Sequence, residues 1–200
     1  MPTDSHRRLE AIAKRASSRS TNPERHQCFI SYHQDDETEA EDFIDTYSDV
    51  FIAKVLGVSD EDDFIGSDDT DYVMRRIREL YLTDSTVTIV LVGKCTWARK
   101  YVDWEIASTL RNDDNNKRSG LLGITLPSAA NHSGKQPPAR LQDNLPPTGG
   151  AGYARWKKYP TSKSSLSDWI DDAFSARTSS SRYELIDNTM SLYKNNRACP

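Results

Sequence analysis

One glutamate stands where a helix could hold a carboxylate against the core of a domain. Glu105 lies in the segment Ala98–Leu110, in which Val102, Ile106 and Leu110 recur at helical spacing. A carboxylate held beside this apolar face could stabilise a positive charge that develops on a bound substrate. The same spacing is also typical of a surface glutamate beside an apolar stripe. Position alone therefore leaves both interpretations open.

A strand is predicted directly before this helix. Ser85–Val92 is a run rich in β-branched residues that is closed by Gly93, a pattern typical of a strand buried on both faces. The strand, a short connection and the helix form a compact unit on which a site could be built.

The rest of the chain alternates between predicted strands and predicted helices. Apolar runs predict strands at Gln27–Tyr32, Phe51–Val58, Ser85–Val92, Gly120–Leu126 and Tyr153–Tyr159, with a continuation of the preceding helix as the alternative for Phe51–Val58. Helical spacing predicts helices from Thr38 onward and over Asp71–Leu82, Ala98–Leu110, Ser164–Arg177 and Arg182–Tyr193. The alternation predicts an α/β fold, with a parallel sheet of about five strands and helices on both faces.

The edge at which ligands bind follows from this topology. In parallel sheets, ligands bind beyond the carboxyl ends of the strands. Tyr32–Asp36 and Gly93–Trp97 both follow predicted strands and are expected to meet there.

At the outer surface, Arg78 is expected to face solvent, and Ser164 or Ser165 is expected to cap its helix.

Length and hydropathy limit the domain organisation. The chain has 200 residues, enough for one domain with a sizeable core. We expect a flexible basic extension over residues 1–25, a folded domain over 26–178 and a helical extension over 179–200. No apolar run approaches the roughly 18 residues of a membrane span, and the first residues lack an apolar signal core. These features predict a cytoplasmic protein that does not enter a membrane.

The cysteines are few and far apart. Cys28, Cys95 and Cys199 are odd in number and widely spaced along the chain. This pattern predicts free thiols in a reducing compartment and argues against a disulfide framework or a zinc site.

Acidic residues are concentrated in one part of the chain. Half of the 30 acidic residues fall between Asp35 and Asp71, where Lys54 is the one basic residue. Such a surface repels nucleic acid, so no nucleic-acid partner is expected. Within it, Ser59–Thr70 fails as a calcium loop, because the register set by its glycine puts Ile65 at a ligand position. No metal site is predicted, and GxGxxG and P-loop lysine motifs are absent.

Two features of the sequence have competing interpretations. Ser128–Gly152 is rich in proline and glycine and is predicted to be a long irregular loop, of a length that is usually functional or mobile. Trp97 and Trp104 are expected to anchor the core or an interface, and stacking on an adenine is the alternative.

Several segments together resemble the TIR-like proteins of bacteria, a family that includes the TIR component of the Thoeris anti-phage defence system. The segments are CFISYHQDD, STVTIVLVGKCTWARKYVDWEI, and the later RLQDNLPP with GYARWKKYP, in that order over roughly Gln27–Phe174. Their order and spacing carry the resemblance. It implies a flavodoxin-like parallel sheet, in agreement with the alternation of strands and helices.

The resemblance also implies an activity. Such proteins consume NAD⁺ as a substrate and need no other cofactor. In this chain Glu105 matches the glutamate that engages the nicotinamide ribose, and Tyr101 stands where many relatives carry a tryptophan. The residues expected at the mouth of the pocket are Phe29, Ser31, Tyr32 and His33.

The expected function is that of an NAD⁺-cleaving TIR enzyme. It would release nicotinamide and convert the ADP-ribose part into a signalling nucleotide, expected to be cyclic, that activates a separate anti-phage effector. Self-association could complete the site, and Ser128–Gly152 could act as a lid that excludes water. The alternative is a non-catalytic TIR module that binds a nucleotide or a protein. A phosphorelay receiver is a third interpretation, but Gly93 stands where its phosphoacceptor aspartate would end the third strand.

Overall fold

The computed structural model describes residues 25–55, 69–112 and 117–199. Nearly all of the expected N-terminal extension lies outside the described residues. The same holds for residues 59–68 of the acidic loop and for residues 56–58 at the end of the expected second strand.

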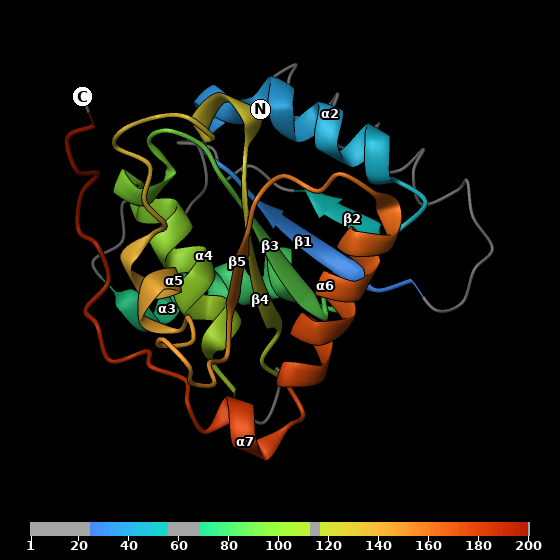
Figure 1. Cartoon of the computed structure of the whole chain (residues 1–200). Coiled ribbons are helices and arrows are strands. Elements are labelled where there is room, and N and C mark those ends of the chain that lie inside the picture. The colour runs from blue at the N-terminus through green and yellow to red at the C-terminus, as the bar shows by residue number, and fades with distance from the viewer. Residues whose placement is uncertain (1–24, 56–68, 113–116, 200) are drawn as a thin grey trace.

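A five-stranded parallel sheet forms the centre of the molecule (Figure 1). Its order is β2-β1-β3-β4-β5, and every neighbouring pair is parallel. The strands are β1 (Gln27–Ser31), β2 (Ile52–Val55), β3 (Val87–Val92), β4 (Gly120–Thr125) and β5 (Arg155–Lys157). This flavodoxin-like order confirms the predicted α/β fold. All residues of β3 and β4 are buried, as expected for strands covered on both faces.

Helices cover both faces of the sheet. Figure 1 shows α2 (Glu37–Tyr47) and α6 (Lys163–Ala176) on one side, and α3 (Thr70–Ile77), α4 (Lys100–Leu110) and α5 (Ala139–Asp143) on the other. The strands divide their side chains between the two faces because successive residues point in opposite directions. In β1, Cys28 and Ile30 join the core under α2 and α6, whereas Phe29 joins the core under α3 and α4.

Two helix ends differ from the predictions. The cap of α6 is Ser162, whose hydroxyl accepts a hydrogen bond from the Ser165 N–H, so neither Ser164 nor Ser165 is the cap. Beyond α3, the chain continues as a π-helical turn over Arg78–Leu82. This wider turn carries Arg78 inward, where it is buried and donates to the Arg111 carbonyl at 3.1 Å. The prediction that Arg78 faces solvent was therefore wrong.

The segment Ser128–Gly152 is more regular than predicted. It contains part of a 3₁₀ turn over Pro127–Ala129 and the whole of α5. Arg140 of α5 is buried and forms an ion pair with Asp103 of α4, with Nε 2.9 Å from Oδ1. This buried contact fixes the middle of the segment to α4.

The predicted helix over Arg182–Tyr193 was also wrong. Helix α7 covers only Ser180–Tyr183, and the chain then runs along the side of α4 and α5 without regular structure (Figure 1). Several of its polar groups bond to the domain. The Tyr193 N–H donates to Asp103 Oδ2 at 3.0 Å, and Trp104 Nε1 donates to the Tyr193 carbonyl at 2.9 Å.

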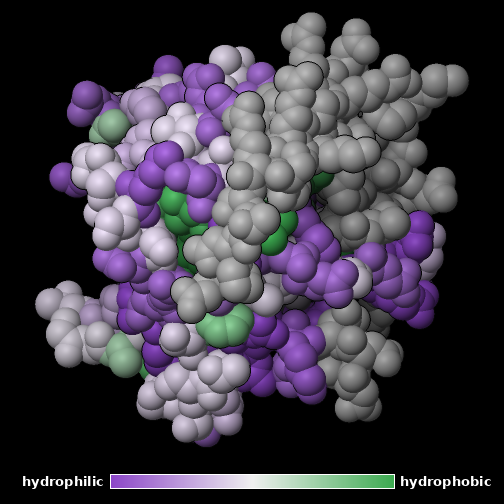
Figure 2. Space-filling view, turned by 90° about the vertical axis from the view of Figure 1, so that its right-hand side faces the viewer, coloured by the Kyte–Doolittle hydropathy of each residue, from purple (hydrophilic) through white to green (hydrophobic). Residues whose placement is uncertain are grey.

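The surface is largely hydrophilic. The face in Figure 2 shows only small hydrophobic areas outside the grey atoms. Among the described residues, Leu185 is the one large hydrophobic side chain that is exposed. None of the helices in the described ranges has the length and apolar character needed to span a membrane. Over the same ranges, no cluster of His, Cys, Asp and Glu has the arrangement of a metal site.

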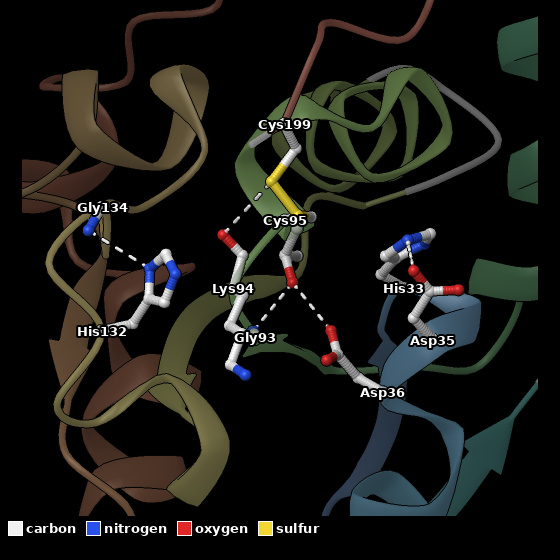
Figure 3. Close-up of a disulfide and its surroundings, with 10 residues drawn as sticks. His33, Asp35, Asp36, Gly93, Lys94, Cys95, His132, Gly134 and Cys199 are labelled. Atoms are coloured by element: carbon white, nitrogen blue, oxygen red, sulfur yellow. Dashed lines mark hydrogen bonds and ion pairs between the residues drawn. A yellow bond between two sulfur atoms is a disulfide. The ribbon is translucent and has the colours of Figure 1, made fainter.

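A disulfide joins Cys95 to Cys199, which corrects the prediction of three free thiols (Figure 3). The two residues are 104 positions apart, and the path of the C-terminal segment along α4 brings their Cα atoms to 5.7 Å. Cys28 is free and buried. The disulfide closes the C-terminal segment onto the loop that follows β3.

The Asp103–Arg140 pair predicts the effect of one substitution on stability. Asp103→Asn leaves the buried Arg140 guanidinium without its counter-charge and should lower the free energy of unfolding by about 3–5 kcal/mol. Chemical denaturation measures this loss. Glu184→Gln, at an exposed position, is the matched control and should change stability little. Equal stability of the two variants would contradict the assigned role of the pair.

The disulfide predicts a count of reactive thiols. Under denaturing, non-reducing conditions, a maleimide should label one thiol per chain, that of Cys28. After reduction it should label three. Mass spectrometry of the intact protein reads the count directly, and three labels without a reductant would exclude the disulfide.

Candidate functional site

Glu105 lies on the face of α4 that is turned toward the sheet, beside Ser31 of β1, which decides between the two interpretations that the spacing left open. Its side chain is buried, with 4% of the residue exposed. Ser31, the last residue of β1, lies beside it and is 1% exposed. Within the described part of the chain, neither Glu105 Oε2 nor Ser31 Oγ has a partner in full hydrogen-bonding geometry. A buried carboxyl group and a buried hydroxyl therefore lie next to each other, and both can form further hydrogen bonds with a ligand.

Burial controls the protonation of Glu105. Loss of hydration raises the pKa of the Glu105 carboxyl from 4.5 to about 8, and the adjacent Ser31 hydroxyl acts weakly in the opposite direction. Near neutral pH the empty site therefore holds Glu105 mostly as the neutral acid. A ligand that brings positive charge next to Glu105 would favour the carboxylate, because opposite charges lower the pKa of an acid.

Tyr32 and His33 continue from β1 at the carboxyl edge of the sheet. Burial raises the pKa of Tyr32, and the nearby carboxyl groups of Glu37 and Glu105 raise it further. His33 Nε2 lies 3.1 Å from Asp35 Oδ2. Burial and the nearby Arg99 guanidinium lower the pKa of His33. The His33 ring is thus half-buried and lies near two charged groups, the Asp35 carboxylate and the Arg99 guanidinium.

The aromatic residues near Glu105 have different surroundings. Phe29 has no exposed surface and packs in the core with side chains of α3 and α4, so it contributes to the packing beneath the site and does not face solvent. Trp104 is also a core residue, as expected. Tyr101 is partly exposed and meets Trp104 edge to face, with ring centroids 5.5 Å apart. Lys100 Nζ lies 4.8 Å from the centroid of the Tyr101 ring.

A hydrogen-bonded link at the same edge was missed by the sequence analysis. The Gly93 N–H donates to Thr96 Oγ1 at 2.8 Å, and Thr96 Oγ1 donates to Asp36 Oδ2 at 3.2 Å. Figure 3 shows Asp36 reaching from the segment after β1 toward the loop after β3. A side chain at position 93 would collide with the Asp36 carboxylate, which explains the glycine there. This glycine at the end of a strand was the available sequence signal.

The link joins the two loops that border Glu105. Burial raises the pKa of Asp36 to about 6, whereas the Thr96 hydroxyl stabilises its charged form. Asp36 is therefore mainly ionised at neutral pH and anchors the β3–α4 loop. This arrangement brings two pairs of residues to one edge of the sheet. Tyr32 and His33 follow β1, and Arg99 and Tyr101 lie at the start of α4.

A family model described as the TIR-like domain of the Thoeris protein ThsB matches residues 29–131. The match covers just over half of the 200 residues and runs from β1 past β4. It includes Glu105 and all five residues expected to bind the substrate. No curated protein matched the chain.

The raised pKa of Glu105 predicts a stabilising substitution. Between pH 4.5 and about 8 the unfolded chain releases a proton that the folded chain keeps, so the free energy of unfolding falls as the pH rises. Glu105→Gln removes this dependence. The variant should match the wild type near pH 4.5 and be more stable at pH 9, by an amount on the order of 2–4 kcal/mol.

Thermal unfolding at the two pH values checks this prediction. Asp103→Asn serves as the matched control, since Asp103 is a second buried carboxyl residue on α4 and has a charged partner. It should destabilise the protein where Glu105→Gln stabilises it. Loss of stability in Glu105→Gln at both pH values would show that Glu105 has a structural partner instead.

Proposed function

Because this chain belongs to the family of the Thoeris ThsB TIR-like domain, we propose that it cleaves NAD⁺ and releases nicotinamide. The observation that carries the proposal is the burial of Glu105 beside Ser31, without a cation or a donor in full hydrogen-bonding geometry at Oε2 among the described residues. An unpaired buried carboxyl group costs stability, and such groups are concentrated at functional sites.

The proposed chemistry uses Glu105 as an electrostatic group. Cleavage of the bond between ribose and nicotinamide builds positive charge on the sugar, as in other glycosidic cleavages. The Glu105 carboxylate would accept hydrogen bonds from the ribose hydroxyls and face the developing cation. The pyridinium of NAD⁺ already carries a positive charge, so nicotinamide departs as a neutral molecule without protonation. A second carboxyl group is therefore not required.

Ionisation of Glu105 would accompany substrate binding. The positive nicotinamide ring, placed near Glu105, favours loss of the proton that the empty site retains. The proton passes to solvent as the substrate binds. Ser31 Oγ, free within the described region, could then hold either the carboxylate or a ribose hydroxyl. Tyr101, one helical turn before Glu105, would offer its partly exposed ring to the ribose side of the substrate.

We place the product in a signalling role. The ADP-ribose part would be cyclised or transferred to give a nucleotide that diffuses to a separate anti-phage effector. Cyclisation requires that a second group of the same ligand reaches the anomeric carbon before water does. Ser128–Gly152, fixed to α4 through Arg140, is the proposed cover of the site, and self-association of the chain could complete it.

One observation favours the alternative of a non-catalytic TIR module. The Tyr101 ring packs against Trp104 and Lys100, and burial keeps Glu105 largely neutral at pH 7. A site with these properties could bind a nucleotide, or a second TIR domain, without turnover. Release of nicotinamide distinguishes this module from the enzyme.

The proposal predicts the loss of activity in one variant. Wild-type protein incubated with NAD⁺, with and without lysate of phage-infected cells, should release nicotinamide in at least one condition, as measured by chromatography. Glu105→Gln should lower the rate by about 100-fold or more. The exposed Glu184→Gln, which makes the same chemical change, should retain the wild-type rate. Absence of release from the wild type in both conditions supports the binding module. Equal rates for wild type and Glu105→Gln exclude the proposed role of Glu105.

A further inference from the structure

A cavity lies at the opposite edge of the sheet from His33 and Gly93. Its volume is about 240 Å³, and it opens where β3 and β4 begin and where α4 and α6 end. The residues that line it are Arg78, Leu82, Thr83, Asp84, Ser85, Thr86, Ser108, Lys117, Ser119 and Arg177. None of the residues proposed for NAD⁺ cleavage lines this cavity.

The described residues that line the cavity carry more positive than negative charge. Arg78, Lys117 and Arg177 supply three cationic groups, and Asp84 supplies one carboxylate. The Asp84 charge is already shared with Lys54, whose Nζ lies 3.6 Å from Asp84 Oδ2. The charges of the described lining therefore favour an anionic ligand over a cationic one.

Hydroxyl groups supply the rest of the polar lining, and one of them is not used by the fold. Ser85 is 6% exposed, and its Oγ has no hydrogen-bond partner within the described part of the chain. Two other hydroxyls of the lining do form hydrogen bonds within the fold. Ser119 Oγ donates to the Ser85 carbonyl at 2.9 Å, and Thr83 Oγ1 donates to the Glu79 carbonyl at 2.8 Å. A buried donor without a partner in the described part of the chain, in a cavity that three cationic residues also line, is suited to an oxyanion, because phosphate accepts from hydroxyl and guanidinium groups at once.

We propose that this cavity binds the phosphate group of a small phosphorylated molecule, such as a sugar phosphate. The cavity is smaller than the 300–1,000 Å³ typical of pockets for drug-sized ligands, which limits the occupant to a phosphate with a compact substituent. Arg177 and Lys117 neutralise the phosphate, and the Ser85 hydroxyl donates to one of its oxygens. The proposal is independent of NAD⁺ cleavage, since it uses a different set of residues at the other edge of the sheet.

The test uses the full chain with inorganic phosphate and ribose 5-phosphate as probes. Calorimetric titration and thermal unfolding are compared with sodium chloride at the same ionic strength. Both phosphates should bind and raise the melting temperature above the chloride value. Ribose 5-phosphate should bind more tightly than inorganic phosphate if the substituent also contacts the cavity, and equal affinities would restrict the site to the phosphate group.

Variants locate the binding within the molecule. Lys117→Gln and Arg177→Gln should each raise the dissociation constant about tenfold. Lys158→Gln removes one exposed positive charge just beyond β5, at the opposite edge of the sheet, and should leave the dissociation constant unchanged. Ser85→Ala should weaken phosphate binding without lowering the stability of the free protein, because the hydroxyl makes no hydrogen bond within the described residues. This combination separates a ligand-binding role from a structural one.

Two results would overturn the proposal. The first is a phosphate effect no larger than that of chloride at equal ionic strength. The second is phosphate binding that Lys117→Gln, Arg177→Gln and Lys158→Gln weaken to the same extent, which would indicate general attraction to positive charge in place of a built site.

Discussion

The structure depends on how α4 accommodates two buried acidic side chains two residues apart. Asp103 points away from the sheet and is paired with Arg140, which also donates to Asn188 and to the carbonyl of Met190. This network attaches α5 and the C-terminal segment to α4. Glu105 points toward β1 and has no such partner among the described residues. One acidic side chain therefore fixes the helix in place, and the other lies buried in the candidate site without a charged partner among the described residues.

The same contrast links stability to the proposed chemistry. A buried ion pair resists the loss of either member, because the remaining charge would be left in a medium of low polarity. A buried unpaired acid is instead kept neutral and gains from any ligand that supplies positive charge. The Asp36–Thr96–Gly93 link and the Cys95–Cys199 disulfide then fix the loop that leads into α4. These contacts fix the N-terminal part of α4, in which Asp103 lies two residues before Glu105.

Local patterns predicted the parts of the fold that depend on local spacing. The apolar stripe correctly predicted α4 but left the burial of Glu105 open, and the β-branched run correctly predicted β3. Contacts between distant segments had no such signal. Asp103 and Arg140 are 37 residues apart, and the two bonded cysteines are 104 residues apart. The segment Arg182–Tyr193 has helical spacing, but its backbone bonds to Asp103 and other parts of the domain, and tertiary contacts overrode the local preference.

Titration of the Glu105 carboxyl carbon by NMR tests the central claim most directly. The protein would carry ¹³C-labelled glutamate, and Glu105→Gln would identify the resonance. We expect a pKa of about 8 in the free protein and a lower pKa when NAD⁺ is bound. A pKa near 4.5 that does not change on addition of NAD⁺ would contradict both the burial of an unpaired carboxyl group and its contact with the substrate.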